Sequence, residues 1–145
     1  MQGDYEPSSV SWVRDQVATY EASDGVLGGA DEEGRRIIML TTRGARSNKL
    51  RKTPLMRVEH DSAYAVVASL GGAPENPLWF HNVVAHPLVS LQDGGTRHDL
   101  LARQTEGIER EAWCERAVAA YPPYADCQRG TDRLIPIFVL ERPSR

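Results

Sequence analysis

The sequence lacks the features by which metal-binding, disulfide-rich and membrane-spanning proteins are usually recognised. It has only two cysteines, Cys114 and Cys127, without the CxxC spacing of a zinc or thiol-redox motif. His81 and His86 do not have the spacing that places two metal ligands on one helix face. No apolar run approaches the roughly 20 residues that span a bilayer, and the N-terminus does not resemble a signal peptide. We therefore expect no metal site, no disulfide and a cytoplasmic location.

Motifs of several enzyme and binding classes are also absent. There is no GxxxxGK[ST] phosphate loop and no GxSxG serine-hydrolase motif. The 17 basic and 20 acidic residues give a net charge of −3, which argues against a general nucleic-acid-binding protein, because such domains are usually basic. The composition is otherwise that of an ordinary globular protein, and a length of 145 residues predicts one domain with a single core.

The hydrophobic pattern predicts an antiparallel barrel or sandwich of α+β type, in which about six strands are interrupted by two helices. Gly94 and Gly95 predict a hairpin between two of these strands. Pro136 places the last strand at a sheet edge or at a bulge. The strands are expected at residues 35–42, 53–60, 62–70, 87–93, 96–104 and 133–141.

Three helices are expected. The first covers residues 9–22, with a serine just before it or at its start as the cap. Its apolar stripe consists of Val10, Val13, Val17 and Tyr20. The stripe favours packing on the domain, with contact to a membrane or a partner as the alternative. The other two helices are expected over 76–86, capped by Asn76, and over 108–121, capped by Thr105.

Positive charge is concentrated in the segment 43–52, which has five basic residues and no acidic one. Gly44 and Asn48 tolerate positive φ, so a turn here can aim consecutive backbone N–H groups at one anion. Arg46 and Arg51 add fork-shaped donors that suit phosphate. The segment predicts either an anion-binding loop or a solvated hairpin tip.

Two further segments are candidate ligand sites. A predicted strand ends in the small residues of "ASLGG", where a flat ligand could approach the backbone, and the aromatic pair Trp79 and Phe80 follows. Tyr121 and Tyr124 lie three residues apart at a helix end, where a phenol can pack on a ring and still donate a hydrogen bond. Plain core packing is the alternative for both segments.

Taken in order, five segments resemble the deazaflavin-dependent nitroreductase family, which binds coenzyme F420 on a split β-barrel. They are TTRGARSNKLRKTPL, VVASLGG, NPLWFHNVVAHPLVSLQ, AYPPYADC and TDRLIPIFVLE. The resemblance extends from about Trp12 to Glu141, and its most specific part is the Asn-Pro-x-Trp-x-x-Asn core of NPLWFHN. It implies an N-terminal helical segment over 1–24 and one split-barrel coenzyme domain over 25–145. The sequence departs from the family at Ala45 and Leu70, where basic residues are common, and at Cys127, where some relatives have an aromatic residue.

The resemblance also implies where ligands bind. The basic loop would hold the phosphate and the acidic glutamate tail of the coenzyme, and the strand end with the following helix would line the deazaflavin ring. The implied coenzyme-binding residues are Ala45, Arg46, Ser47, Arg51, Lys52, Thr53, Pro54, Leu55, Met56, Val67, Ala68, Ser69, Leu70, Leu78, Trp79, Phe80, His81 and Asn82. The substrate pocket would hold Tyr121 and Tyr124. The proton that follows the hydride would come from Tyr121, Tyr124, Ser69 or water.

The function implied by the resemblance is hydride transfer from reduced coenzyme F420 to an electron-poor small molecule, either a quinone, an enone or a nitroaromatic compound. Three alternatives remain open. They are a flavin mononucleotide-dependent reductase on the same barrel, a non-catalytic deazaflavin carrier or sensor, and a barrel that binds a nucleic-acid backbone. The acidic net charge counts against the last, so no nucleic-acid partner is expected. Peripheral membrane contact through the first helix is a further expectation.

Overall fold

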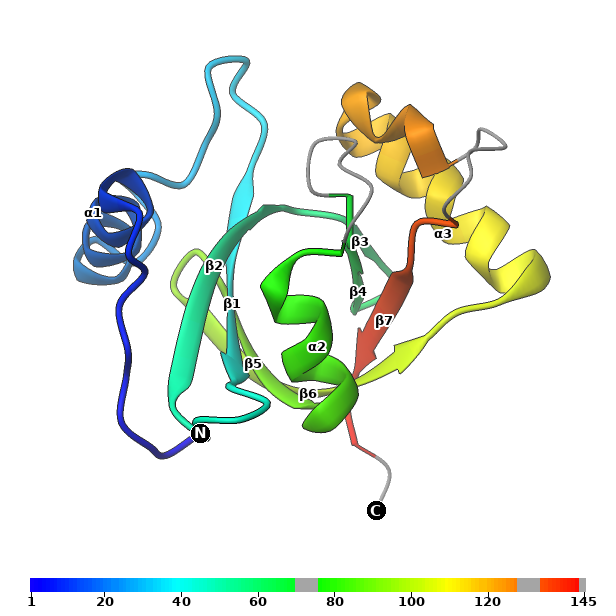
Figure 1. The fold of residues 1–145 in the computed structure, drawn as a ribbon. Coiled ribbons are helices and arrows are strands. Elements are labelled where there is room, and N and C mark those ends of the chain that lie inside the picture. Colours follow the sequence, from blue (N-terminus) through cyan, green and yellow to red (C-terminus); the bar gives the residue numbers. More distant parts are fainter. Residues whose placement is uncertain (70–75, 128–133, 144–145) are drawn as a thin grey trace.

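The computed structural model describes residues 1–69, 76–127 and 134–143. In this part of the chain, helices pack around one curled antiparallel sheet (Figure 1). The elements are α1 Ser11–Ala22, β1 Ile37–Arg43, β2 Leu50–Met56, β3 Glu59–His60, β4 Ala63–Val67, α2 Leu78–Ala85, β5 Leu88–Asp93, β6 Thr96–Gln104, α3 Gly107–Ala120, the 3₁₀-helix η1 Pro122–Cys127, and β7 Ile137–Glu141.

The sheet has the order β2-β1-β5-β6-β7-β4-β3, and every neighbouring pair is antiparallel. It curls into a half-barrel with α2 lying in the opening (Figure 1), which confirms the α+β split barrel. The described chain has one strand more than expected, because the predicted strand 53–60 is divided into β2 and β3 at Arg57 and Val58. Asp61 and Ser62 both have positive φ and form the tight turn that folds β3 back onto β4.

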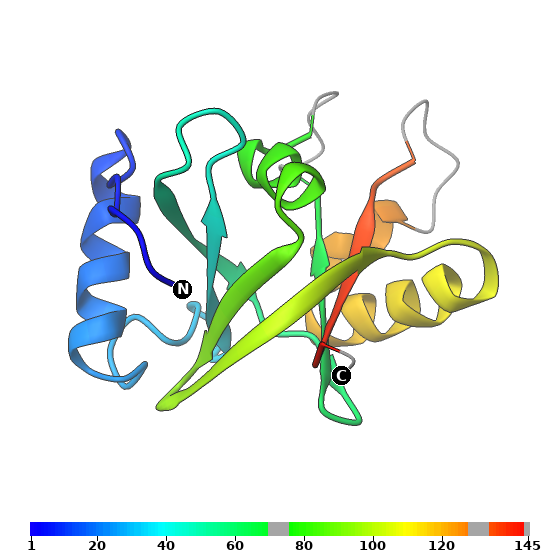
Figure 2. The same cartoon turned by 90° about the horizontal axis from the view of Figure 1, so that it is seen from below.

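Alternating side chains of β4 and β7 divide the core into two clusters. Tyr64 and Val66 point into the half-barrel, where they pack with Trp79 of α2. Ala65 and Val67 point the opposite way and pack with α3 and η1. Because successive residues of a strand face opposite sides, both faces of this part of the sheet are covered by helices. Figure 2 shows α2 and α3 at different sides of β4 and β7.

The first helix lies against the outer face of β1. Val17 and Tyr20 are buried there with Met39, and Val13 is partly buried. The Tyr20 hydroxyl accepts a hydrogen bond from the Gly94 N–H at 2.9 Å and lies 3.1 Å from the Ile37 carbonyl oxygen. Most of the predicted apolar stripe therefore packs on the barrel.

The expected capping residues are wrong, and so is the expectation that Pro136 marks an edge strand; the alternative of a bulge stays a prediction. The N-cap residues are Val10, Pro77 and Glu106, and none of them makes a side-chain cap hydrogen bond. The hydroxyl of Thr105 donates to the carbonyl of Ile137 instead. Pro136 precedes β7, which is paired on both sides and is not an edge strand. Tertiary packing, not local capping, fixes where these helices begin.

Charged side chains surround the buried Asp93 carboxylate at the β5–β6 hairpin. The Asp93 carboxylate accepts hydrogen bonds from the Tyr64 hydroxyl at 2.7 Å and from Arg57 and Arg36 at 2.9 Å each. Burial alone would raise the pKa of the Asp93 carboxyl, but the hydrogen bonds from Tyr64 and Arg57 lower it below its ordinary value. Burial together with Asp93 raises the pKa of Tyr64 to about 12.

Replacing Asp93 by asparagine should lower the free energy of unfolding by about 2–4 kcal/mol, less than for a fully buried pair because Arg36 is exposed to water. The lowered folded-state pKa means that the carboxylate stabilises the fold above about pH 4, and that this contribution is lost as the pH falls further. Chemical denaturation at several pH values would measure both effects. Equal stability of Asp93→Asn and wild type near neutral pH would contradict this role.

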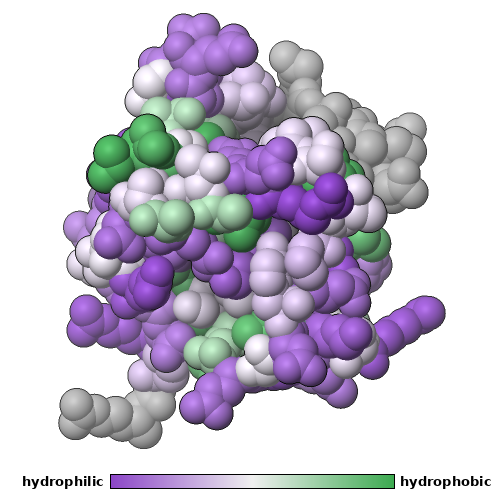
Figure 3. Space-filling view, turned by 90° about the vertical axis from the view of Figure 1, so that its left-hand side faces the viewer, coloured by the Kyte–Doolittle hydropathy of each residue, from purple (hydrophilic) through white to green (hydrophobic). Residues whose placement is uncertain are grey.

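None of the described helices is long and apolar enough to cross a membrane. Figure 3 shows the face that carries α1, where hydrophobic residues form small separate patches among hydrophilic ones. Val10 and Trp12 are exposed in the first helical region, with 46% and 64% of their surface accessible. Val26 and Leu27, which follow α1, are exposed as well, with 82% and 61% of their surface accessible.

Candidate coenzyme and substrate site

The β1–β2 turn is tight and lies beside α2 (Figure 2). The Gly44 N–H donates to the carbonyl of Lys49 at 2.7 Å, and the Asn48 N–H donates back to the carbonyl of Gly44 at 3.1 Å. Asn48 has a φ of 59°, as its predicted tolerance of positive φ allows. A Cβ at Gly44 would lie 2.4 Å from the Ser47 hydroxyl oxygen and 3.2 Å from the Lys49 carbonyl oxygen, so any larger residue would force the Ser47 side chain to move.

Asn82 of α2 holds this turn in place. Its side-chain oxygen accepts the Ala45 N–H at 3.0 Å, and its side-chain nitrogen donates to the Thr42 hydroxyl at 3.2 Å. Asn82 is the last residue of the family core NPLWFHN, and the resemblance implied that it lines the ring. The contacts add a second role, because they couple the basic turn to the helix that carries the aromatic pair.

The basic segment is not one loop. The turn spans only residues 44–49, and Arg51 and Lys52 belong to β2. They face opposite sides, since Lys52 forms an ion pair with Glu21 of α1, and Arg51 forms one with Glu6. Arg51 and Lys52 therefore present their charges on opposite faces of β2, and their predicted contacts with the coenzyme stay a prediction.

The rest of β2 alternates in the same way. Leu55 packs against the interior cluster, together with Phe80 of α2, and lies on the same side as Arg51 and Thr53. Met56 packs against the outer cluster that contains the two tyrosines. The predicted run 51–56 thus contributes to two surfaces.

The predicted ring-lining residues also fall on different sides. Ala68 and Trp79 are buried in the interior cluster, with Phe80 partly exposed at its margin. Val67 belongs to the outer cluster. Ser69 is buried two residues after the end of β4. Leu78 and His81 are exposed on α2, and Leu70 lies outside the described residues. A ligand that touches most of these residues must lie at the end of β4, where the two clusters meet.

The two tyrosines are packed edge to face at the corner between α3 and η1. Their ring centroids are 4.9 Å apart, and the Arg35 guanidinium lies 5.4 Å from the centre of the Tyr121 ring. Tyr124 is buried, and this burial raises the pKa of its hydroxyl to about 12. Tyr121 is only partly buried. Both rings touch the outer cluster, on the side of Met56 and Val67.

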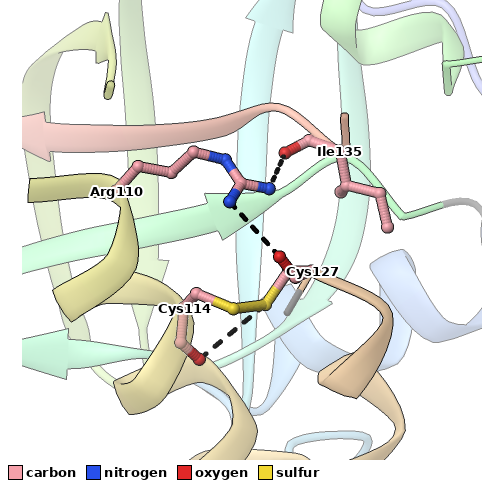
Figure 4. The surroundings of a disulfide bond; sticks show 4 residues. All are labelled: Arg110, Cys114, Cys127 and Ile135. Carbon is pink, nitrogen blue, oxygen red and sulfur yellow. Dashed lines mark hydrogen bonds between the residues drawn. A yellow bond between two sulfur atoms is a disulfide. The ribbon is translucent and has the colours of Figure 1, made fainter. Parts of the chain in front are cut away.

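A disulfide joins the two elements that hold these tyrosines, contrary to the expectation of free cysteines. Cys114 of α3 and Cys127 of η1 are bonded, with their Cα atoms 6.0 Å apart (Figure 4). Arg110 donates to the carbonyls of Cys127 and Ile135, at 3.2 Å and 2.8 Å. The chain turns back on itself at the two prolines, and this turn brings together cysteines whose spacing matches no motif.

Opening the disulfide should lower the free energy of unfolding by about 3 kcal/mol, the value for a loop of similar length. The double variant Cys114→Ser/Cys127→Ser and reduced wild type should show the same loss in denaturant titrations. The double variant provides the control, because added reductant should not change its stability. A wild-type protein that is equally stable with and without reductant would contradict the prediction.

Comparison with known proteins identifies the fold and the chemistry together. The pattern of the F420H(2)-dependent quinone reductase family matches residues 12–142. An F420H(2)-dependent quinone reductase of Mycobacterium tuberculosis is 30% identical over 136 residues, which cover 92% of this chain and 91% of that protein. The chain belongs to the F420H2-dependent quinone reductase family. It is thus an oxidoreductase that depends on coenzyme F420, as the resemblance implied.

Two solved structures are similar to the chain in both sequence and fold. An F420-H2 dependent reductase (FDR-A) is 56% identical, with a TM-score of 0.68 over 72% of this chain and 93% of its own. A protein described as a domain-swapped dimer is 48% identical, with a TM-score of 0.72 over 92% of this chain and 100% of its own. The fold is therefore shared, at substantial identity, with one structure described as an F420-H2 dependent reductase and with one described only as a domain-swapped dimer. Which residues of this chain contact the coenzyme stays a prediction.

Sequence reasoning missed three features of the site. Glu6 and Glu21 pair with β2 cations from segments far away in sequence, and Asn82 binds the turn. The disulfide is the third. The only signal in the sequence for the ion pair of Glu6 was its acidic character in the segment DYEP, where it is the last acidic residue before the first helix.

Proposed function

We propose that this member of the family reduces quinones with F420H2, binding the coenzyme between the β1–β2 turn and α2. The observation that carries the placement is the hydrogen bond from the Ala45 N–H to Asn82. It holds a basic turn against the helix whose aromatic pair closes the interior cluster. A ligand with an anionic end and a flat apolar end fits such an arrangement.

The donors of the turn fit a phosphate group. Within the described chain, the backbone N–H groups of Arg46 and Ser47 and the Arg46 guanidinium donate to no other residue. Consecutive free N–H groups next to a free guanidinium can surround one anion. Arg46 is exposed, so it can reach a ligand without a change in the fold. We assign Arg46 and Ser47 to the phosphate, and Arg51 to the acidic tail.

The apolar end of the ligand would lie over the end of β4. Small residues there, Ala68 and Ser69, allow a flat ring to approach the backbone. Phe80 on one side and Met56 on the other would pack against its two ends. Coenzyme F420 supplies a two-electron hydride when bound, and the residues of the chain bind it, orient the acceptor and keep water away.

The acceptor pocket is assigned to the outer cluster, where Tyr121, Tyr124, Met56 and Val67 meet. Aromatic and thioether side chains suit a flat apolar ring such as a quinone. Hydride transfer to a quinone also requires one proton. Burial raises the pKa of Tyr124, which makes its hydroxyl a poor proton donor, whereas the Tyr121 side chain is partly exposed and can face the acceptor. We therefore assign proton donation to the Tyr121 hydroxyl.

A titration with coenzyme F420 and flavin mononucleotide side by side tests the coenzyme placement. We expect micromolar or tighter binding of F420 and much weaker binding of the flavin, because the flavin has a phosphate but no acidic tail. Fluorescence of each ligand would report its binding. Tighter binding of flavin mononucleotide would favour a flavin-dependent reductase on this barrel.

Location is a separate proposal. The cytoplasmic location stays a proposal, against which the Cys114–Cys127 disulfide counts. Peripheral membrane contact through Val10 and Trp12 is supported by the exposed side chains of the first helical region. Co-sedimentation with phospholipid vesicles, compared between wild type and Trp12→Ser, would test the membrane contact. Equal partition of both proteins would contradict it.

A further inference from the structure

The N-terminal segment Asp4–Glu6 lies along the free edge of β2. Tyr5 forms a parallel bridge with Leu50, in which the Leu50 N–H donates to the carbonyl of Asp4 at 2.7 Å and the Glu6 N–H donates to the carbonyl of Leu50 at 2.9 Å. We call residues Asp4–Glu6 the edge segment. It covers a strand edge that would otherwise expose unpaired backbone groups.

The edge segment places a carboxylate on the basic segment. Glu6 forms an ion pair with Arg51 and lies 3.9 Å from the Lys49 ammonium group. Lys52, on the opposite face of β2, pairs with Glu21 of α1 and lies under the Tyr5 ring. Arg43 donates to two backbone carbonyls. Of the five cations between residues 43 and 52, Arg46 alone has no partner among the described residues.

We propose that Glu6 competes with the acidic tail of the coenzyme for Arg51 and Lys49, and so limits how tightly the tail is held. The inference rests on the proposed function, which assigns Arg51 to the tail. Arg51 lies on the side of β2 that carries Leu55, which packs on the interior cluster as Phe80 of α2 does. A tail that is bound by Arg51 therefore has to take the place of the Glu6 carboxylate.

The magnitudes allow such competition. Arg51 and Glu6 are both partly exposed, with 29% and 43% of their side-chain surface accessible, so their ion pair is worth at most about 1 kcal/mol. The edge segment is held on β2 by two backbone hydrogen bonds. A ligand with several carboxylates and an anchored phosphate can therefore displace Glu6, while Glu6 still weakens binding measurably.

The test compares Glu6→Gln with Glu21→Gln. Both variants remove one negative charge and one β2 ion pair, but Glu21 neutralises Lys52 on the other face. Two probes would be titrated by fluorescence, namely coenzyme F420 and the deazaflavin nucleoside that lacks phosphate and tail. We expect Glu6→Gln to bind F420 about 2- to 5-fold more tightly than wild type and the nucleoside equally well. Glu21→Gln should resemble wild type with both probes.

A double-mutant cycle separates competition for Arg51 from a general charge effect. In the Arg51→Ala background, Glu6→Gln should lose most of its effect on F420 affinity. Unchanged F420 affinity of Glu6→Gln, or the same gain in Glu21→Gln, would overturn the inference while leaving the proposed function intact. Failure of the wild-type chain to bind F420 would contradict the proposed function, and the inference with it.

Discussion

Tyr121→Phe is expected to slow quinone reduction by roughly 10²–10⁴-fold, the range for loss of a general acid. The substitution keeps the ring, and with it the edge-to-face contact with Tyr124 and the position of the guanidinium of Arg35. Coenzyme affinity should stay close to that of wild type, because the basic turn that is assigned to the phosphate is untouched. Steady-state oxidation of F420H2 with a quinone, together with F420 titration, would separate the two effects.

Tyr124→Phe is the matched control. Its hydroxyl is buried and has a raised pKa, so its removal should change turnover far less than removal of the Tyr121 hydroxyl. If Tyr124→Phe is the slow variant and Tyr121→Phe has wild-type kinetics, the proton donor has been assigned to the wrong tyrosine. If both retain wild-type turnover, the proton comes from Ser69 or from water.

The second large effect is expected at Arg46. Arg46→Ala should weaken F420 binding by about 10- to 100-fold, since a hydrogen bond to a charged group contributes about 1.5–3 kcal/mol. Arg46 has no partner among the described residues, so its removal costs the free protein no ion pair. A loss of affinity in this variant can therefore be read as a lost ligand contact and not as a disturbed fold.

Arg97→Ala provides the control for Arg46→Ala. Arg97 is an exposed arginine of β6 next to the hairpin, and its nearest carboxylate, that of Asp24, is 3.9 Å away. The Arg97→Ala variant should bind F420 with the affinity of the wild-type protein. Wild-type affinity should also fall as salt is added, because exposed charges are screened. Equal affinities of Arg46→Ala and wild type would place the phosphate elsewhere.

The sequence predicted the elements that have simple patterns. The glycine pair gave the β5–β6 hairpin, and the apolar stripe gave α1 with its buried Val17 and Tyr20. The edge strand β2 was harder, because its first residues are basic and Pro54 interrupts it. Proline is tolerated there because β2 is an edge strand, and this can be known only once the sheet order is known.

The site was predictable in outline and not in detail. The NPLWFHN core indicated the coenzyme and the helix that binds it, but not the hydrogen bonds by which Asn82 holds the turn. Pairing of Glu6 with Arg51 depends on an N-terminal segment that follows no regular pattern. The disulfide depends on the corner between α3 and η1. Such contacts arise from how distant segments meet, which local spacing does not encode.

The most direct test of the central claim is the oxidation of F420H2 by a quinone, followed by the return of the deazaflavin absorbance, with and without the protein. The account predicts that the purified chain accelerates this reaction in proportion to its concentration, and that Tyr121→Phe retains F420 binding but loses most of the acceleration. A chain that binds F420 and leaves the rate at its uncatalysed value with a series of quinones would contradict the proposed function and favour a coenzyme carrier.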